Sequence, residues 1–172
     1  MYYYLSIGTN IDPEFNAVAI VKNLINEFGG LYLFPFVKTE PVNICSFNYF
    51  LNSICVMQSN LDTESVKEIT NRIEVQLGRK RFDLLSGQKD READIDIIIS
   101  SDSPIEFRNL KVEEPYVNAV LSSEFLQRVD LKLFGLPSIY RPSSINFDTR
   151  TGQIVVVDDK FSRFYKTFKS PF

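Results

Sequence analysis

Residues 49–58, with the sequence YFLNSICVMQ, carry the strongest strand signal in the chain and decide its fold class. Aromatic and β-branched residues are frequent in this segment, and both types favour strands. Successive side chains of a strand point to opposite faces. One face would carry Phe50, Asn52, Ile54 and Val56, and the other would carry Leu51, Ser53, Cys55 and Met57.

Outward from this strand, the chain alternates between strand and helix patterns. Apolar residues recur at helical spacing after Asp12-Pro13 and again after Asp62, and the two helices end at Gly29-Gly30 and Gly78. Each aspartate is expected to cap its helix through its side chain. The expected strands are 2–7, 31–37, 49–58 and 93–100.

The order strand-helix-strand, strand-helix-strand predicts an α+β protein with a ferredoxin-like split βαβ sandwich. We expect a mainly antiparallel sheet with helices on one face. The polar segment 79–91 is expected to be a loop, and a short helix is expected at 117–125. A late strand is expected at 154–157, and 160–172 reads as a basic, aromatic tail.

Composition excludes several classes of function. The chain has 172 residues, a net charge of −3 and no histidine, so an imidazole base or a histidine zinc ligand is excluded. An acidic chain argues against nucleic-acid binding, and no apolar run reaches the roughly 20 residues of a membrane span. The two cysteines, Cys45 and Cys55, give no disulfide framework and fit a cytoplasmic protein.

Asp94-Ile95-Asp96 is the sharpest candidate for chemistry. In a strand both carboxylates share one face, with Cα atoms roughly 6.5 Å apart, while Ile95, Ile97 and Ile99 would pack on the other face. Two facing carboxylates repel each other unless they are solvated, protonated or bridged by a cation. The pair therefore suits Mg²⁺ with a phosphate substrate, and the alternative is two solvated aspartates at a strand end.

A cluster of cations precedes the aspartates within one loop. Its members are Arg79, Lys80, Arg81, Lys89 and Arg91. Guanidinium groups next to a metal-binding carboxylate pair suit a polyphosphate. The alternative is a solvated charged loop.

Asn52 lies on an otherwise apolar strand face, close to Phe50. A buried amide needs partners, and its donor and acceptor together match the edge of a planar heterocycle that Phe50 could border. The alternative is an amide satisfied by nearby backbone.

Five short motifs follow one another in residues 2–100. They are Ser6-Ile7-Gly8-Thr9-Asn10, Thr39-Glu40-Pro41-Val42, Tyr49-Phe50-Leu51-Asn52, Ile73-Glu74-Val75-Gln76-Leu77-Gly78-Arg79 and Arg91-Glu92-Ala93-Asp94-Ile95-Asp96. In type, order and near spacing this set resembles the 6-hydroxymethyl-7,8-dihydropterin pyrophosphokinases of the folate pathway. The resemblance implies a pyrophosphokinase-like domain over residues 1–125 and a divergent C-terminal extension over 126–172, packed on the domain or trailing from it.

The resemblance also implies a reaction and a set of roles. The family transfers pyrophosphate from ATP to the pterin hydroxymethyl group and releases AMP. Asp94 and Asp96 would hold two Mg²⁺ ions, and Arg79, Arg81 and Arg91 would serve as catalytic groups on the ATP phosphates. Glu74 would also lie on the ATP side. The pterin would contact Thr39, Val42, Phe50 and Asn52. The partners would be the pterin and ATP, without nucleic acid or membrane, in a monomer or homodimer.

The segment after the aspartates departs from the family pattern. Where the family has V-P-H-P, this chain has Val112-Glu113-Glu114-Pro115, so Glu114 replaces a histidine. A following arginine and aromatic residue are replaced near Val120 and Ser122, and the loop tryptophan is absent. These departures leave open a second reading, in which the chain is a binding or regulatory relative without turnover. Basic or aromatic residues that enter the site from the C-terminal part, such as Arg141 or Arg163, would favour an active enzyme. A small RNA-binding domain is a third and weaker reading, because the chain is acidic and lacks paired aromatic RNA motifs.

Overall fold

The computed structural model describes residues 1–42, 44, 46–80, 89–105, 112, 114–122 and 127–157. Its centre is an antiparallel sheet in which β1 (Tyr2–Thr9) lies between β4 (Phe50–Gln58) and β5 (Asp94–Ser101). On the other side of β4 lie β2 (Leu31–Leu33) and β3 (Phe36–Thr39), two parts of the single strand expected at 31–37. The break falls at Phe34-Pro35, because proline has no amide hydrogen for the sheet.

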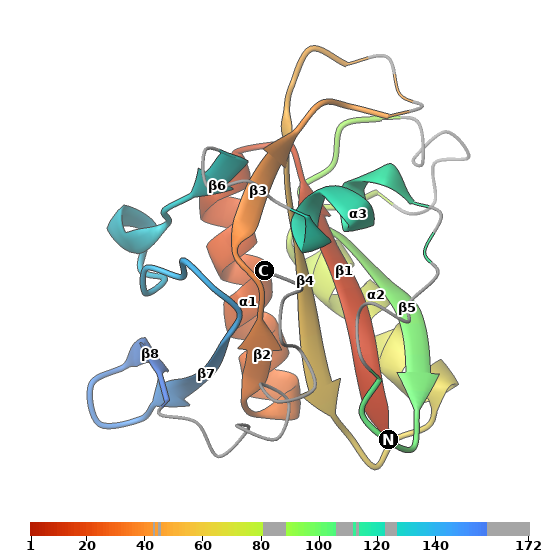
Figure 1. The fold of residues 1–172 in the computed structure, drawn as a ribbon, viewed down its shortest axis with the longest axis vertical. Coiled ribbons are helices and arrows are strands. Elements are labelled where there is room, and N and C mark those ends of the chain that lie inside the picture. Colours follow the sequence, from red (N-terminus) through yellow and green to blue (C-terminus); the bar gives the residue numbers. More distant parts are fainter. Residues whose placement is uncertain are drawn as a thin grey trace.

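The two long helices, α1 (Pro13–Phe28) and α2 (Thr63–Gln76), pack on the same face of the sheet (Figure 1). This face carries the larger core, and its members from β1 are Tyr3, Leu5 and Ile7. The connections β1-α1-β2/β3 and β4-α2-β5 form the split βαβ arrangement predicted from the sequence, so the α+β, ferredoxin-like fold class is confirmed.

A third helix, α3 (Pro115–Leu121), lies on the opposite face (Figure 1). Its buried residues Val117 and Val120 pack in a second core with Tyr4 and Ile54. The expectation of helices on one face therefore holds for α1 and α2 only. The structure describes this helix as ending at Leu121, and the rest of the expected helix 117–125 lies mostly outside the described residues.

Two local expectations were wrong. Asp12 does not cap α1 with its side chain, because its backbone is left-handed (φ 40°) and only its carbonyl accepts from Asn16 N–H; Asp62 does cap α2, accepting from Ser65 N–H at 2.8 Å. Ile99 does not share a face with Ile95, because the β1–β5 register shifts between Tyr4 and Leu5. This bulge places Ile99 against the second core.

The C-terminal part continues the same sheet. β6 (Arg128–Val129) pairs with β3, β7 (Ser143–Asp148) pairs with β2, and β8 (Gln153–Val156) pairs with β7; a short 3₁₀ helix, η4 (Lys132–Phe134), lies between β6 and β7. The late strand expected at 154–157 corresponds to β8. The division into residues 1–125 and 126–172 stays a prediction, and residues 158–172 lie outside the described residues.

Two further expectations concern the cysteines and a membrane span. Cys55 is fully buried, and burial raises the pKa of its thiol to about 12, as expected for a small apolar core residue; Cys45 lies outside the described residues. Within the described chain, none of the helices combines the length and the apolar character that crossing a bilayer requires.

The core provides a test of how the C-terminal strands contribute to folding. Ile145 on β7 is fully buried in the larger core, whereas Val156 on β8 is 48% exposed. Ile145→Ala should lower the free energy of unfolding by about 2–5 kcal/mol, because the removed methyl groups leave a cavity. Val156→Ala is the control and should change it little. Urea unfolding should show one transition for both variants; a separate early transition would mean that β7 and β8 fold as an independent unit.

Candidate functional site

The site expected from the sequence lies on the face of the sheet that carries α3. Gly8 of β1 pairs with Asn52 of β4 on one side and with Asp94 of β5 on the other. A Cβ atom at Gly8 would lie 2.8 Å from the Asn52 amide oxygen and 3.7 Å from the Asp94 Cβ. The absence of a side chain at Gly8 therefore leaves space between the amide and the carboxylate.

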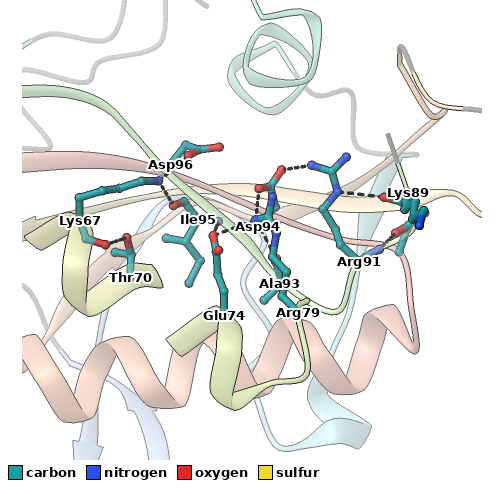
Figure 2. Close-up of polar contacts among 11 residues, drawn as sticks. Lys67, Thr70, Glu74, Arg79, Lys89, Arg91, Ala93, Asp94, Ile95 and Asp96 are labelled. Atoms are coloured by element: carbon teal, nitrogen blue, oxygen red, sulfur yellow. Dashed lines mark hydrogen bonds and ion pairs between the residues drawn. The ribbon is translucent and has the colours of Figure 1, made fainter. Parts of the chain in front are cut away.

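Asp94 lies between two guanidinium groups (Figure 2). Its Oδ1 is 2.5 Å from Arg79 Nη1, and its Oδ2 is 2.8 Å from Arg91 Nη1. Both arginine side chains are nearly buried, and the Asp94 side chain is 25% exposed. The loop cations and the strand carboxylate expected from the sequence are thus in direct contact.

The Glu74 carboxylate fixes the position of the Arg79 guanidinium. The Glu74 side chain is fully buried, and its Oε1 accepts from the Ile95 amide at 2.7 Å and pairs with Arg79 Nη1 at 3.0 Å (Figure 2). Burial disfavours the charged guanidinium, but the charges of Asp94 and Glu74 outweigh it, so the pKa of Arg79 is raised. In this conformation Glu74 can act on a ligand only through Arg79.

One donor of Arg79 is buried and unsatisfied within the described part of the chain. Its Nε is buried and has no hydrogen-bond partner among the described residues. A buried donor without a partner costs free energy, and an anionic oxygen would satisfy it. Because Nε is buried, a ligand would reach it only if the guanidinium moved from this position.

Asp96 is the more open carboxylate, with its side chain 53% exposed. Its partner is Lys67 of α2, whose Nζ lies 2.6 Å from Asp96 Oδ1 and also donates to the Ile95 carbonyl at 3.0 Å (Figure 2). Sequence reasoning missed Lys67. A signal was present, because Lys67 precedes Glu74 by seven residues and so lies on the same helix face two turns away.

Tyr116 of α3 is a second residue that sequence reasoning missed. Its phenol lies close enough to Ser6, the β1 partner of Asp96, for Ser6 to lower its pKa. Burial has the larger effect and raises the pKa of Tyr116, and the charges of Glu114, Asp96 and Asp94 add to this rise. Glu114, which is exposed at the start of α3, therefore acts electrostatically on the same area as the two aspartates.

The amide side of the site is formed by β3 and β4. Asn52 is 6% exposed and donates from Nδ2 to Thr39 Oγ1 at 2.7 Å. The Phe50 ring lies beside Arg91, with the guanidinium carbon 5.7 Å from the ring centroid. Val42 is 46% exposed and lies beyond the end of β3. Thr39, Phe50 and Asn52 are thus brought together next to Gly8.

A pocket of about 280 Å³ opens on the cation side. Its lining is Gly78, Arg79, Lys80, Lys89, Asp90, Arg91 and Glu92. Arg81 and Arg163 lie outside the described residues. Arg141 precedes β7, which is separated from β5 by β2, β4 and β1. The cations of this pocket therefore come from both ends of the segment expected to be a loop.

Comparison with known proteins agrees with this geometry. The family model described as 7,8-dihydro-6-hydroxymethylpterin-pyrophosphokinase matches residues 4–127. A 2-amino-4-hydroxy-6-hydroxymethyldihydropteridine pyrophosphokinase of Porphyromonas gingivalis is 32% identical over 114 residues, which are 65% of this chain and 74% of that protein. The folic acid synthesis protein fol1 of Schizosaccharomyces pombe is 26% identical over 112 residues, 63% of this chain but only 15% of that protein.

The match to the family model covers most of the chain, and it includes the strands and the helix that carry the acidic, basic and amide groups described above. The chain therefore belongs to the 7,8-dihydro-6-hydroxymethylpterin-pyrophosphokinase family of diphosphotransferase enzymes.

Proposed function

We propose that the chain transfers the pyrophosphoryl group of ATP to the hydroxymethyl group of 6-hydroxymethyl-7,8-dihydropterin, with Mg²⁺, and releases AMP. The observation that carries this proposal is the single row Asn52–Gly8–Asp94, in which a buried amide and an arginine-bound carboxylate face each other across a glycine. A planar substrate held by the amide would present its side chain towards the carboxylate and the cations.

Arg79 and Arg91 are proposed to bind the ATP phosphates. Both guanidiniums already lie at Asp94, and Lys80 and Lys89 line the same pocket. Phosphoryl transfer depends mainly on positioning and on charge neutralisation, so a chain without histidine can perform it. Arg81 is proposed for the same role from the resemblance alone.

The residues present fit a magnesium site. Asp94 and Asp96 face the same side of β5. In this conformation Asp94 pairs with two arginines and Asp96 with Lys67, so an ion bound there would replace some of these contacts. Two carboxylates with an open side suit Mg²⁺, which keeps water and takes its remaining ligands from substrate phosphates. Bound there, Mg²⁺ would neutralise charge that develops on the phosphates. We propose two ions, held by Asp94 and Asp96.

Glu74 is proposed to support ATP binding by orienting Arg79. Its buried carboxylate binds both the Arg79 guanidinium and the Ile95 amide. Because Ile95 follows Asp94 in the chain, this contact fixes the position of Arg79 relative to Asp94. A group fixed in advance loses less conformational freedom when the ligand binds.

Asn52, Thr39 and Phe50 are proposed to bind the pterin. The Asn52 amide can offer both a donor and an acceptor to the heterocycle, and Thr39 sets its orientation. Phe50 would border the ring, and Val42 is proposed as a contact from the segment that follows β3.

We further propose a cytoplasmic monomer or homodimer that uses only these small molecules as partners.

A specific observation keeps the second reading in view. Glu114 replaces the histidine of the family pattern, is exposed, and adds negative charge beside Tyr116 and the two aspartates. The alternative is therefore a relative that binds pterin or nucleotide and has lost turnover. Production of AMP from ATP, Mg²⁺ and 6-hydroxymethyl-7,8-dihydropterin distinguishes the two: the enzyme releases AMP only with the pterin present, and the binding protein releases none.

Asp96 provides the clearest test of the metal assignment. Asp96→Ala should abolish transfer and leave the fold intact, because its partner Lys67 is itself partly exposed and can be solvated. Asp94 is less suitable, since its removal takes a carboxylate away from two nearly buried arginines, of which Arg79 keeps Glu74. The measurements are AMP release and thermal unfolding. Near-normal turnover in the Asp96→Ala protein would show that the aspartate pair has another role.

Asn52 tests the pterin pocket. Asn52→Ala should weaken pterin binding by about 1–3 kcal/mol, since groups of the ligand lose their partners, while binding of ATP should change far less. Isothermal titration with each ligand measures both effects. Ser144→Ala is a control at another nearly buried polar position of the same sheet, on β7. Equal losses for both ligands in the Asn52 variant would indicate a folding defect instead.

Glu114 tests the effect of the family departure. A carboxylate near the phosphates opposes nucleotide binding, with a size that salt screens. Wild-type affinity for α,β-methylene-ATP with Mg²⁺ should therefore be weak, and Glu114→Gln or Glu114→His should raise it, most clearly at low salt. Isothermal titration at two salt concentrations measures this. Tight wild-type binding that falls on replacement of Glu114 would contradict the assignment.

A further inference from the structure

Three separate segments meet at the carboxylate of Asp90. Its Oδ1 accepts from Asn10 Nδ2 at 2.6 Å, and its Oδ2 accepts from Asn48 Nδ2 at 2.7 Å. Ser46 lies close enough to this carboxylate to lower its pKa. Asn10 follows β1, Ser46 and Asn48 precede β4, and Asp90 precedes β5. One side chain thus joins the ends of the three strands that carry the proposed site.

The backbone next to Asp90 is also attached to the end of β1. The Arg91 amide donates to Asn10 Oδ1 at 2.8 Å, and the Arg91 carbonyl accepts from the amides of Asn10 and Ile11 at 3.1 and 3.3 Å. Asn10 is only 3% exposed. Its side chain therefore serves both Asp90 and Arg91, and the position of the Arg91 main chain depends on this arrangement.

Asn48 connects the same carboxylate to the pterin side. It lies two residues before Phe50 and four before Asn52, the two β4 residues proposed to contact the pterin. Arg91, next to Asp90, lies beside the Phe50 ring and pairs with Asp94. A shift of the segment before β4 can thus move Arg91 through the hydrogen bond between Asn48 and Asp90.

The chemistry of the group suits such a link. An ionised carboxylate can accept several hydrogen bonds at once, whereas an amide has a single accepting oxygen. The nearby Ser46 side chain lowers the pKa of Asp90 against the opposing effect of burial, and Asn10 and Asn48 add to the lowering, so the side chain is ionised at neutral pH. Two asparagine donors therefore find their acceptors in one residue.

We propose that Asp90 is a positioning residue that couples the pterin side of the site to Arg91 on the nucleotide side, so that each ligand strengthens binding of the other. This inference rests on the proposed function. Coupling of this kind is reciprocal: the factor by which nucleotide improves pterin affinity equals the factor by which pterin improves nucleotide affinity. Asp90 also lines the pocket proposed for the phosphates, and in this proposal it acts through Arg91 and not by direct contact with either ligand.

The test combines single and exchanged variants. Asp90→Ala removes the acceptor, and Asn48→Asp sets two carboxylates against each other. Asp90→Asn combined with Asn48→Asp reverses the roles: the new amide at position 90 donates to the new carboxylate at position 48 and still accepts from Asn10. Asp130→Ala is the matched control, because Asp130 also joins loop segments by accepting from Ser138, Tyr140 and the Lys132 amide, but it follows β6 on the far side of β3.

Two measurements are needed. The first is hydrogen exchange at the amides of Asn10, Ile11 and Arg91 without ligand. The second is the coupling factor, obtained by titrating 6-hydroxymethylpterin with and without α,β-methylene-ATP and Mg²⁺. Asp90→Ala and Asn48→Asp should lower the coupling factor about tenfold, the size expected when a charge-assisted hydrogen bond is lost. Both should speed exchange at these amides, the double variant should recover both readouts, and Asp130→Ala should leave them unchanged.

The outcomes separate the two levels of the proposal. Unchanged exchange and an unchanged coupling factor in Asp90→Ala would overturn the positioning role, as would a double variant that recovers neither readout. A wild-type protein that binds both ligands without coupling would overturn it as well. If the wild type binds neither ligand, the proposed function fails. Amide hydrogen exchange in the variants at positions 90 and 48 then still decides whether Asp90 orders Arg91.

Discussion

The buried carboxylate of Glu74 is the interaction on which the site depends. A charge with no exposure to water must be paired and hydrogen-bonded, and here the partners are the Arg79 guanidinium and the Ile95 amide. Because Glu74 belongs to α2 and Ile95 to β5, the same group also joins the helix layer to the sheet. The position of Arg79, and through it that of Asp94 Oδ1, follows from a buried contact that a ligand would not touch.

The sequence was sufficient to predict the fold where local patterns agree with tertiary packing. The alternation in residues 49–58 assigned the two faces of β4 correctly, and the helices and strands expected between residues 2 and 100 have the right type, with the strand expected at 31–37 divided into β2 and β3. The loop expected at 79–91 lies mostly outside the described residues. The alternation rule failed at Ile99, since a bulge inserts one residue and reverses the face beyond it. Nor could periodicity reveal β7, whose partner β2 is more than one hundred residues earlier in the chain. A pairing at such distance leaves no local pattern.

The sequence predicted which residues gather at the candidate site better than it predicted the contacts between them. Asp94, Arg79, Arg91 and Asn52 do gather on one face, and motif and strand period were enough for this. The burial of Glu74 and the approach of Lys67 to Asp96 depend on how α2 packs against β5, which no spacing rule defines. Roles for these residues on ATP, the pterin and Mg²⁺ stay predictions, as do the positions of Arg81 and the residues after 157.

The position of β5 in the sheet has a consequence of a different kind. β5 pairs with β1 on one side and is the last strand of the described sheet in that direction, so its outer edge could pair with another chain except where α2 side chains occupy it. Glu74 accepts from the Ile95 amide, and Lys67 donates to the Ile95 carbonyl. Charged side chains and bulges are the common means by which proteins prevent strands of neighbouring molecules from adding to such an edge. β5 has both, in Asp94, Asp96 and the irregularity near Ile99, and Lys67 reaches across to it from α2. The acids proposed for chemistry are thus also the kind of side chain that disfavours addition of another strand at a sheet edge.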